Sequence, residues 1–105
     1  MGEVMKLHLT EHELNEVRGI LRGVLSGEQK VIAFGSRVKG THRPTSDLDL
    51  AIAGDTSLSL ALRSKLEFGF SESDLPFRVD VVDLTAVEPA FRAIIESEGV
   101  PLIYL

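Results

Sequence analysis

The stretch over residues 34–50 constrains the fold most, because it places two aspartates inside an otherwise apolar run. Asp47 and Asp49 are separated by one residue, so a β-strand here turns both carboxylates to the same face. Two like charges on a buried strand are costly unless a cation or a bound partner compensates them. A Gly35-Ser36 pair and three cationic residues stand between Phe34 and these aspartates. This stretch therefore predicts a binding site.

The length, composition and net charge of the chain limit what that site can be. Its 105 residues, 44% of them hydrophobic, suit one domain over residues 1–105 with one core. A net charge of −5 disfavours a broad nucleic-acid footprint, although a local cluster can still bind a small anion. The chain has no cysteine, which excludes disulfides and thiolate zinc sites. Without a signal peptide or an apolar run of about 20 residues, we expect no membrane contact and a cytoplasmic location.

The hydrophobic pattern predicts helices and strands in alternation. A helix is expected to begin after Thr10, which forms a capping box with Glu13. The expected strands cover residues 30–34, 47–53, 77–83 and 101–105, and the expected helices cover 36–39, 57–70 and about 87–98. The connection between the first two strands is too short for a parallel crossover, which favours an antiparallel pair. The helix before the third strand is long enough to make the second and third strands parallel neighbours.

A third carboxylate is expected to join the pair from the third strand. If this strand lies beside the second, Asp80 can reach the face that carries Asp47 and Asp49. Three carboxylates repel one another when empty, and hard divalent cations with oxygen ligands resolve that conflict. Two metal ions about 3.5–4 Å apart could share the cluster. Asp83 stays open as an alternative third carboxylate, although it is expected on the opposite side of the strand.

The residues before the aspartates predict a phosphate contact. Glycine lets the backbone approach an anion closely, and a helical turn from Ser36 offers free N–H groups and a hydroxyl. Arg37 and Lys39 could add charge-assisted contacts to phosphate. The spacing from Gly35 to Gly40 is similar to a P-loop, but Thr41 stands where that motif needs lysine. We therefore reject the P-loop interpretation.

Together these motifs resemble the DNA polymerase β-type nucleotidyltransferase superfamily. The resemblance rests on Gly35-Ser36, followed after ten residues by Asp47-Leu48-Asp49, and on Asp80 in a later apolar strand. Within that superfamily, the chain is similar to the minimal (MNT) nucleotidyltransferases in its short length and in the sequence of its motif. The resemblance implies an α/β (α+β) two-layer core, with a mixed sheet and helices packed mainly on one face. It also implies ATP and two magnesium ions at Asp47, Asp49 and Asp80.

The resemblance further assigns roles to these residues. Asp47 and Asp49 would hold magnesium with the nucleotide triphosphate, and Asp80 would complete the metal site and help to deprotonate the acceptor hydroxyl. Gly35 and Ser36 would hold the phosphates. Catalytic roles are thus expected for the three aspartates, and nucleotide binding for residues 35–37 and 39.

Minimal members of the superfamily resemble one half of a two-gene system whose other half is a helical HEPN protein. This implies an antitoxin that moves AMP from ATP to a hydroxyl of the HEPN partner. One alternative is a non-catalytic antitoxin that neutralises its partner by binding alone. Another is an enzyme that modifies a small hydroxylated molecule of the aminoglycoside type. Direct nucleic-acid binding is not expected.

Several further residues remain open from sequence. His42 lies in the loop of the motif and could contact nucleotide or acceptor, or only solvent. His8 and His12 are four residues apart, but His8 precedes the expected cap, so we expect ordinary surface histidines. The glycines at positions 19, 23 and 27 form one helix face, for which solvent exposure is the favoured interpretation. Phe68 lies off the apolar stripe of its helix and could contact a partner.

Overall fold

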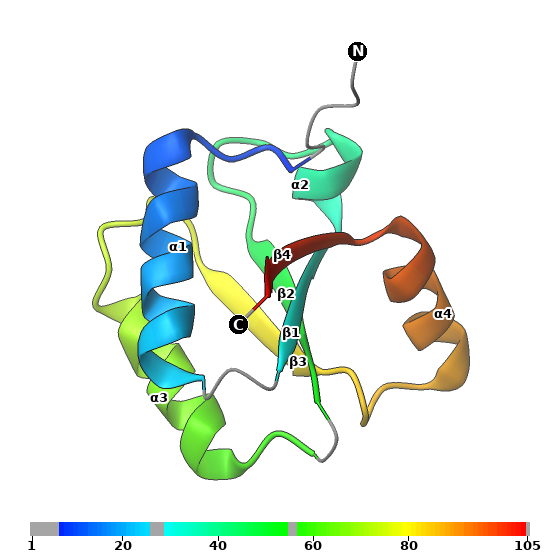
Figure 1. Ribbon diagram of the computed structural model, residues 1–105. Coiled ribbons are helices and arrows are strands. Elements are labelled where there is room, and N and C mark those ends of the chain that lie inside the picture. Colours follow the sequence, from blue (N-terminus) through cyan, green and yellow to red (C-terminus); the bar gives the residue numbers. More distant parts are fainter. Residues whose placement is uncertain (1–6, 26–28, 55–56, 105) are drawn as a thin grey trace.

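The computed structural model describes residues 7–25, 29–54 and 57–104 (Figure 1). Helices and strands alternate along the chain. The helices are α1 (Glu11–Val24), α2 (Ser36–Lys39), α3 (Leu60–Ser71) and α4 (Pro89–Glu98). The strands are β1 (Lys30–Phe34), β2 (Leu48–Ala53), β3 (Val79–Asp83) and β4 (Val100–Tyr104). In the described part of the chain, no helix has the length and apolar character to cross a membrane.

The four strands form one mixed sheet in the order β3-β2-β1-β4. β1 pairs antiparallel with β2 and with β4, whereas β2 and β3 run parallel. The two strand pairings that the sequence predicts, antiparallel for β1 with β2 and parallel for β2 with β3, are therefore confirmed, and β4 forms one edge of the sheet. The parallel pair matters most for the site, because it fixes which residue of β3 lies beside Asp49 of β2.

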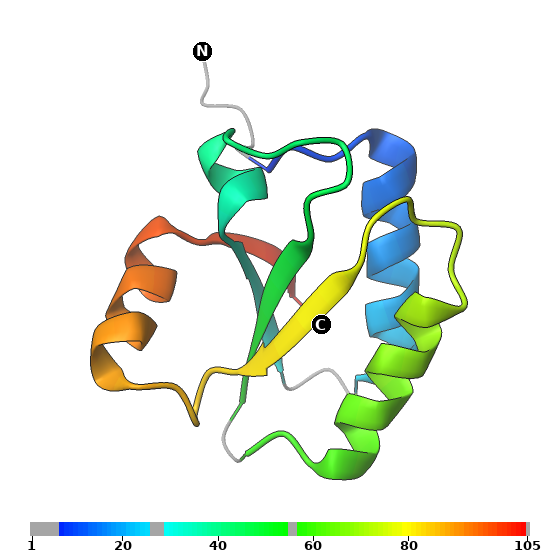
Figure 2. The same cartoon turned by 180° about the vertical axis from the view of Figure 1, so that it is seen from behind.

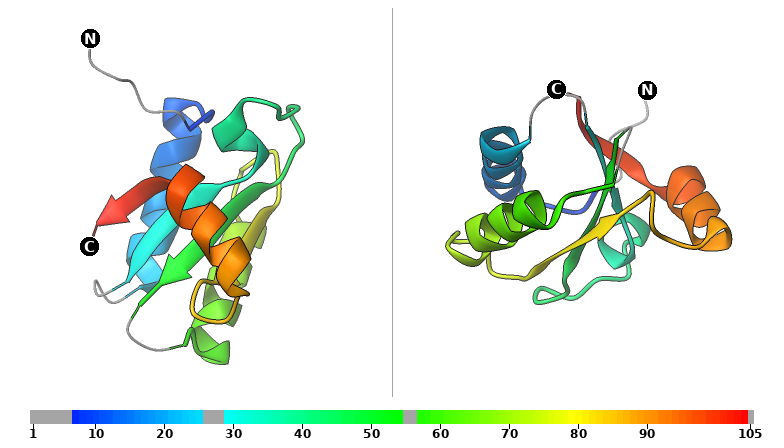
Figure 3. Two further views of the ribbon diagram at one scale, coloured as in Figure 1. Left: turned by 90° about the vertical axis from the view of Figure 1, so that its right-hand side faces the viewer. Right: turned by 90° about the horizontal axis from the view of Figure 1, so that it is seen from below.

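The helices form two unequal layers around the sheet. Figure 3 shows α1 and α3 side by side on one face and α4 on the other. Leu14, Val17 and Leu21 of α1 enter the main core, where α3 and every strand contribute further buried apolar side chains. A smaller cluster under α4 contains Ala51, Leu84 and Ile95. The expected mixed sheet with helices mainly on one face is confirmed, and α4 partly covers the face opposite the main core.

Alternation along β2 explains why one strand serves both layers. Leu48, Leu50 and Ile52 are fully or almost fully buried in the main core. The residues between them point to the other face, where Ala51 packs under α4 and Asp49 is only half-buried. The face with α4 is therefore apolar at one end and carries the carboxylates at the other.

Local hydrogen bonds explain where the helices begin. The capping box of α1 is present, with Thr10 and Glu13 bonded reciprocally at 3.0 Å in both contacts. The prediction that α3 begins at residue 57 is wrong, because Ser59 caps that helix by accepting a bond from the Leu62 amide at 3.1 Å. Among the three glycines of α1 and its end, those at 19 and 23 have open space around them, whereas position 27 lies outside the described residues.

Candidate active site

Asp49 lies at the centre of the candidate site because of its register in the sheet. On one side its Cα partner is Phe34 of β1, the residue directly before Gly35. On the other side its partner is Asp80 of β3. Figure 2 shows β2 between β1 and β3, with α2 near the end of the strands where these residues lie. The structure thus brings the glycine–serine turn, Asp49 and Asp80 together, although Asp80 is distant in sequence.

The carboxylates of this group act on one another electrostatically. Partial burial, then the charge of Asp80, then that of Asp47 raise the pKa of Asp49 from 3.8 to about 6. Asp47 is exposed and directly precedes β2, so the prediction that the strand begins at Asp47 is wrong by one residue. The cluster therefore destabilises its own negative charge, which favours a cation or a proton between the side chains.

Gly35 makes room for the central carboxylate. Its φ of 86° is a conformation that residues with a side chain rarely adopt. A Cβ at this position would collide with Oδ2 of Asp49. The absence of a side chain thus lets the turn lie directly against Asp49. Ser36 begins α2 there, and the first amides of a helix have no acceptor within the helix itself.

Arg37 has a structural role, which corrects the prediction that it contacts phosphate. Its side chain is 4% exposed and its guanidinium lies 4.1 Å from the ring centre of Phe77. Nε donates to the carbonyl of Ser46 at 3.0 Å, Nη1 to that of His8 at 3.1 Å and Nη2 to that of Pro44 at 2.9 Å. These bonds hold the motif loop, residues 40–47, that leads into Asp47. The charge of Arg37 is used inside the protein.

Lys39 remains on the surface beside the turn. It lines a hollow of about 510 Å³ together with Gly35, Val38, Ser97 and Glu98. Its ammonium lies 3.9 Å from the carboxylate of Glu98, and both side chains are more than half exposed. An exposed pair of this kind contributes little to stability and can exchange partners. The position of Lys39 therefore suits the predicted contact with an anion bound at Gly35.

Asp83, the alternative third carboxylate, is a structural residue on the other side of β3. It is 7% exposed and accepts bonds from the Leu58 amide at 2.9 Å and from the amide and hydroxyl of Thr85 at 2.9 and 2.7 Å. Burial alone would raise the pKa of Asp83, but these bonds and the charge of Arg63 hold it below its usual value. The structure excludes it from the cluster.

The donor set of the site is made of carboxylate oxygens, which are the ligands of hard cations such as magnesium. In the ranges that the structure describes, no group of three or more His, Cys, Asp or Glu side chains is gathered closely enough to hold a metal ion. Magnesium is commonly bound by one or two carboxylates with substrate phosphates and water, rather than by a complete protein cage. Asp47 and Asp49 beside the Gly35-Ser36 turn fit that kind of site.

Two histidines lie together near the motif loop, a contact that sequence spacing did not indicate. The ring centres of His8 and His42 are 5.3 Å apart. Nδ1 of His42 is buried and has no hydrogen-bond partner within the described structure. His12 is separate from this pair and lies 3.8 Å from Glu16 on α1. His8 and His12 are both exposed, as expected of surface histidines.

Comparison with known families identifies the chain. The family model described as "Polymerase beta, Nucleotidyltransferase" matches residues 22–104, which include every carboxylate of the site. The chain belongs to this nucleotidyltransferase family. The family assignment that the sequence motifs predicted is therefore confirmed.

Relatives within the family are similar over most of the chain. MntA of Haemophilus influenzae strain Rd, a probable protein adenylyltransferase, is 43% identical over 97 residues, covering 92% of this chain and 84% of MntA. A solved toxin–antitoxin complex with AMP-PNP contains a chain that is 27% identical with a TM-score of 0.73, covering 88% of this chain and 73% of that one. A structure assigned as a minimal nucleotidyltransferase is 28% identical with a TM-score of 0.68, covering 95% and 99%. The fold and the enzyme class are thus those of a nucleotidyltransferase.

Proposed function

We propose that the chain transfers AMP from ATP to a hydroxyl group of a HEPN-type partner protein and so acts as an antitoxin. The register of Asp49 carries this proposal, since it sets one carboxylate between the Gly35 turn and Asp80. A site of this kind needs a phosphate-binding turn next to carboxylates. Support for the transferred group comes from the protein adenylyltransferase name of MntA, and support for the setting comes from the similar toxin–antitoxin complex with AMP-PNP.

The residues on the Gly35 side would bind the nucleotide. The backbone of Gly35 and the amide and hydroxyl of Ser36 would contact the triphosphate, and Lys39 would neutralise part of its charge. Asp47 and Asp49 would hold magnesium with the phosphate oxygens. When bound, magnesium would neutralise charge on the triphosphate and polarise the α-phosphate. The rise in the pKa of Asp49 supports this assignment, because a bound cation would relieve the repulsion that contributes to it.

Asp80 would act on the acceptor. It lies beside Asp49 and its side chain is exposed, so a hydroxyl from outside can approach it. The acceptor oxygen would form a bond to the α-phosphorus while the bond from that phosphorus to the bridging oxygen of pyrophosphate breaks. The proton of the acceptor hydroxyl would pass to the Asp80 carboxylate, and pyrophosphate would leave. Positioning and electrostatic stabilisation would supply most of the catalysis.

The test is transfer of label from ATP to a HEPN-type protein that binds this chain. ATP labelled at the α-phosphate should transfer label to that protein, and ATP labelled at the γ-phosphate should not. The Asp47→Asn/Asp49→Asn double variant should fold but transfer no label. If this variant instead neutralises the partner as well as the wild type, and neither transfers label, the chain acts by binding alone. Because ATP is the substrate, we place the reaction in the cytoplasm.

A further inference from the structure

The last turn of α4 lies beside the Gly35 turn and shares a hollow of about 510 Å³ with it. The turn and α2 contribute Gly35, Val38 and Lys39 to the lining of this hollow. From α4 come Ser97 and Glu98. A volume of this size is typical of small-ligand sites in proteins. The space in which phosphate is expected is therefore bordered by a cation, Lys39, and by an anion, Glu98.

The glycine that follows Glu98 holds this carboxylate near the turn. The amide of Gly99 donates to the carbonyl of Ile95 at 2.8 Å and so closes α4. A Cβ at Gly99 would collide with Cγ2 of Ile32 in β1, so the absence of a side chain lets the end of α4 lie directly against that strand. Because β1 leads into Gly35, the backbone at Glu98 is fixed beside the turn.

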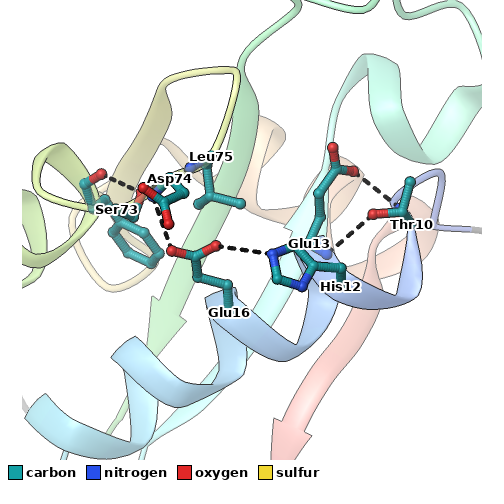
Figure 4. A network of polar contacts seen from close by, with 8 residues as sticks. Thr10, His12, Glu13, Glu16, Ser73, Asp74 and Leu75 are labelled. Atoms are coloured by element: carbon teal, nitrogen blue, oxygen red, sulfur yellow. Dashed lines mark hydrogen bonds and ion pairs between the residues drawn. The ribbon is translucent and has the colours of Figure 1, made fainter.

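The fold itself makes little use of the charge of Glu98. Other glutamates bond to the backbone, since Glu13 accepts the N-cap amide of α1 at 3.0 Å and Glu16 accepts the Asp74 amide at 2.9 Å (Figure 4). Among the residues that the structure describes, the partner of the Glu98 carboxylate is the ammonium of Lys39 at 3.9 Å. Both of these side chains are exposed, and an exposed pair of this kind adds little to stability.

A carboxylate at this place weakens the binding of phosphate to the turn in two ways. First, it competes for a cation. Arg37 is buried and bonded to carbonyls of the motif loop, so the contact with phosphate falls to Lys39, which Glu98 attracts. Second, Glu98 lines the hollow and repels any anion in it, because like charges repel. Both effects act through charge alone, so neither needs a change in the fold.

We propose that Glu98 is a positioning residue that limits the affinity of the Gly35 turn for phosphate by competing for Lys39, and so helps pyrophosphate to leave. This inference rests on the proposed AMP transfer and adds a residue of α4 to the control of that site. The ammonium of Lys39 moves from Glu98 to the phosphate oxygens when ATP binds. After transfer it returns to Glu98, which weakens the contact with pyrophosphate. Product release limits the rate of many enzymes, so such a competitor favours turnover.

The first experiment removes the charge of Glu98 and keeps its shape. Calorimetric titrations of the full chain with ATP and with inorganic pyrophosphate, each with magnesium, give the two Kd values. Glu98→Gln should lower both at least about threefold. Glu96→Gln is the matched control, because it removes the same charge from the same helix at a position that does not line the hollow. This control should leave both Kd values unchanged.

The second experiment asks whether Glu98 acts through Lys39. Lys39→Met should weaken the binding of ATP and of pyrophosphate, and in that background Glu98→Gln should improve binding by a clearly smaller factor than in the wild type. In the transfer assay, Glu98→Gln should lower the KM for ATP and make added pyrophosphate a stronger inhibitor, again at least about threefold. A purely structural role of Glu98 would not make its effect depend on Lys39.

Each outcome has a separate meaning. Unchanged Kd values in folded Glu98→Gln would overturn the inference and leave the proposed function intact. An equal improvement with and without Lys39 would also overturn it, because Glu98 would then act on phosphate without competing for the lysine. Absence of transfer by the wild type would overturn the proposed function and the role in product release, while the Kd values would still decide whether Glu98 competes for Lys39.

Discussion

Removing the charge of Asp49 should stabilise the metal-free protein at neutral pH. In the folded state Asp49 binds its proton more tightly than in the unfolded chain, because burial, Asp80 and Asp47 raise its pKa from 3.8 to about 6. Folding therefore takes up a proton between about pH 4 and pH 6, and the stabilising contribution present below that window is lost as the pH rises through it. Asp49→Asn has no proton to lose and should keep this contribution.

The size of the effect follows from the rise in pKa. At roughly 1.4 kcal/mol per pH unit, the rise from 3.8 to about 6 corresponds to about 3 kcal/mol. Since Asp49 is only half-buried and solvent screens part of the repulsion, we expect about 1–2 kcal/mol at pH 7.5. At pH 4 the difference between variant and wild type should be close to zero.

Urea unfolding followed by circular dichroism in the presence of EDTA measures this difference at both pH values. Asp74→Asn is the matched control, because it removes the same charge from an exposed loop position away from the cluster. The control should show a much smaller change with pH. A loss of several kcal/mol on Asp49→Asn at pH 7.5 would refute the reasoning, since it would mark Asp49 as a carboxylate that the fold itself requires.

Three further substitutions test other parts of the structure. Arg37→Met should lower the free energy of unfolding by roughly 3–5 kcal/mol in urea titrations, because it leaves carbonyls of the motif loop without their charged donor; a change under about 1 kcal/mol would contradict its structural role. Gly35→Ala should weaken ATP binding at least about tenfold in calorimetric titrations with magnesium, since its Cβ would displace Asp49; unchanged affinity would separate the turn from the site. Leu21→Ala should cost about 2–5 kcal/mol in thermal or urea unfolding with no effect on ATP affinity, because Leu21 is fully buried in the main core far from the carboxylates in the fold.

The parts of the site that lie on strands could be predicted from sequence because strand geometry is regular. Alternation predicted that Asp49 points away from the main core side chains of β2, and the length of the helix before β3 predicted the parallel pair that sets Asp80 beside Asp49. The same alternation placed Asp83 on the other side of the strand, where the structure finds it bonded to Thr85. Short motifs and the hydrophobic pattern were sufficient for these positions.

The parts that depend on an irregular loop could not be predicted in the same way. Arg37 looked like a phosphate ligand because it follows Ser36, but its guanidinium binds backbone carbonyls whose positions depend on the path of the motif loop. No side-chain pattern encodes the direction of a carbonyl. The contact between His8 and His42 joins two irregular segments, so the spacing of residues in the sequence could not predict it. The start of α3 shifted because Ser59, rather than residue 57, satisfies the first amides of the helix.

A crystal structure of the protein with AMP-PNP and manganese in place of magnesium tests the central claim most directly. The claim is that Gly35, Ser36, Asp47, Asp49 and Asp80 form one nucleotide site. Anomalous scattering should locate manganese between the carboxylates of Asp47 and Asp49, with the triphosphate over the Gly35-Ser36 turn and the α-phosphate toward Asp80. Nucleotide bound at another place, or manganese bound away from these aspartates, would contradict the account.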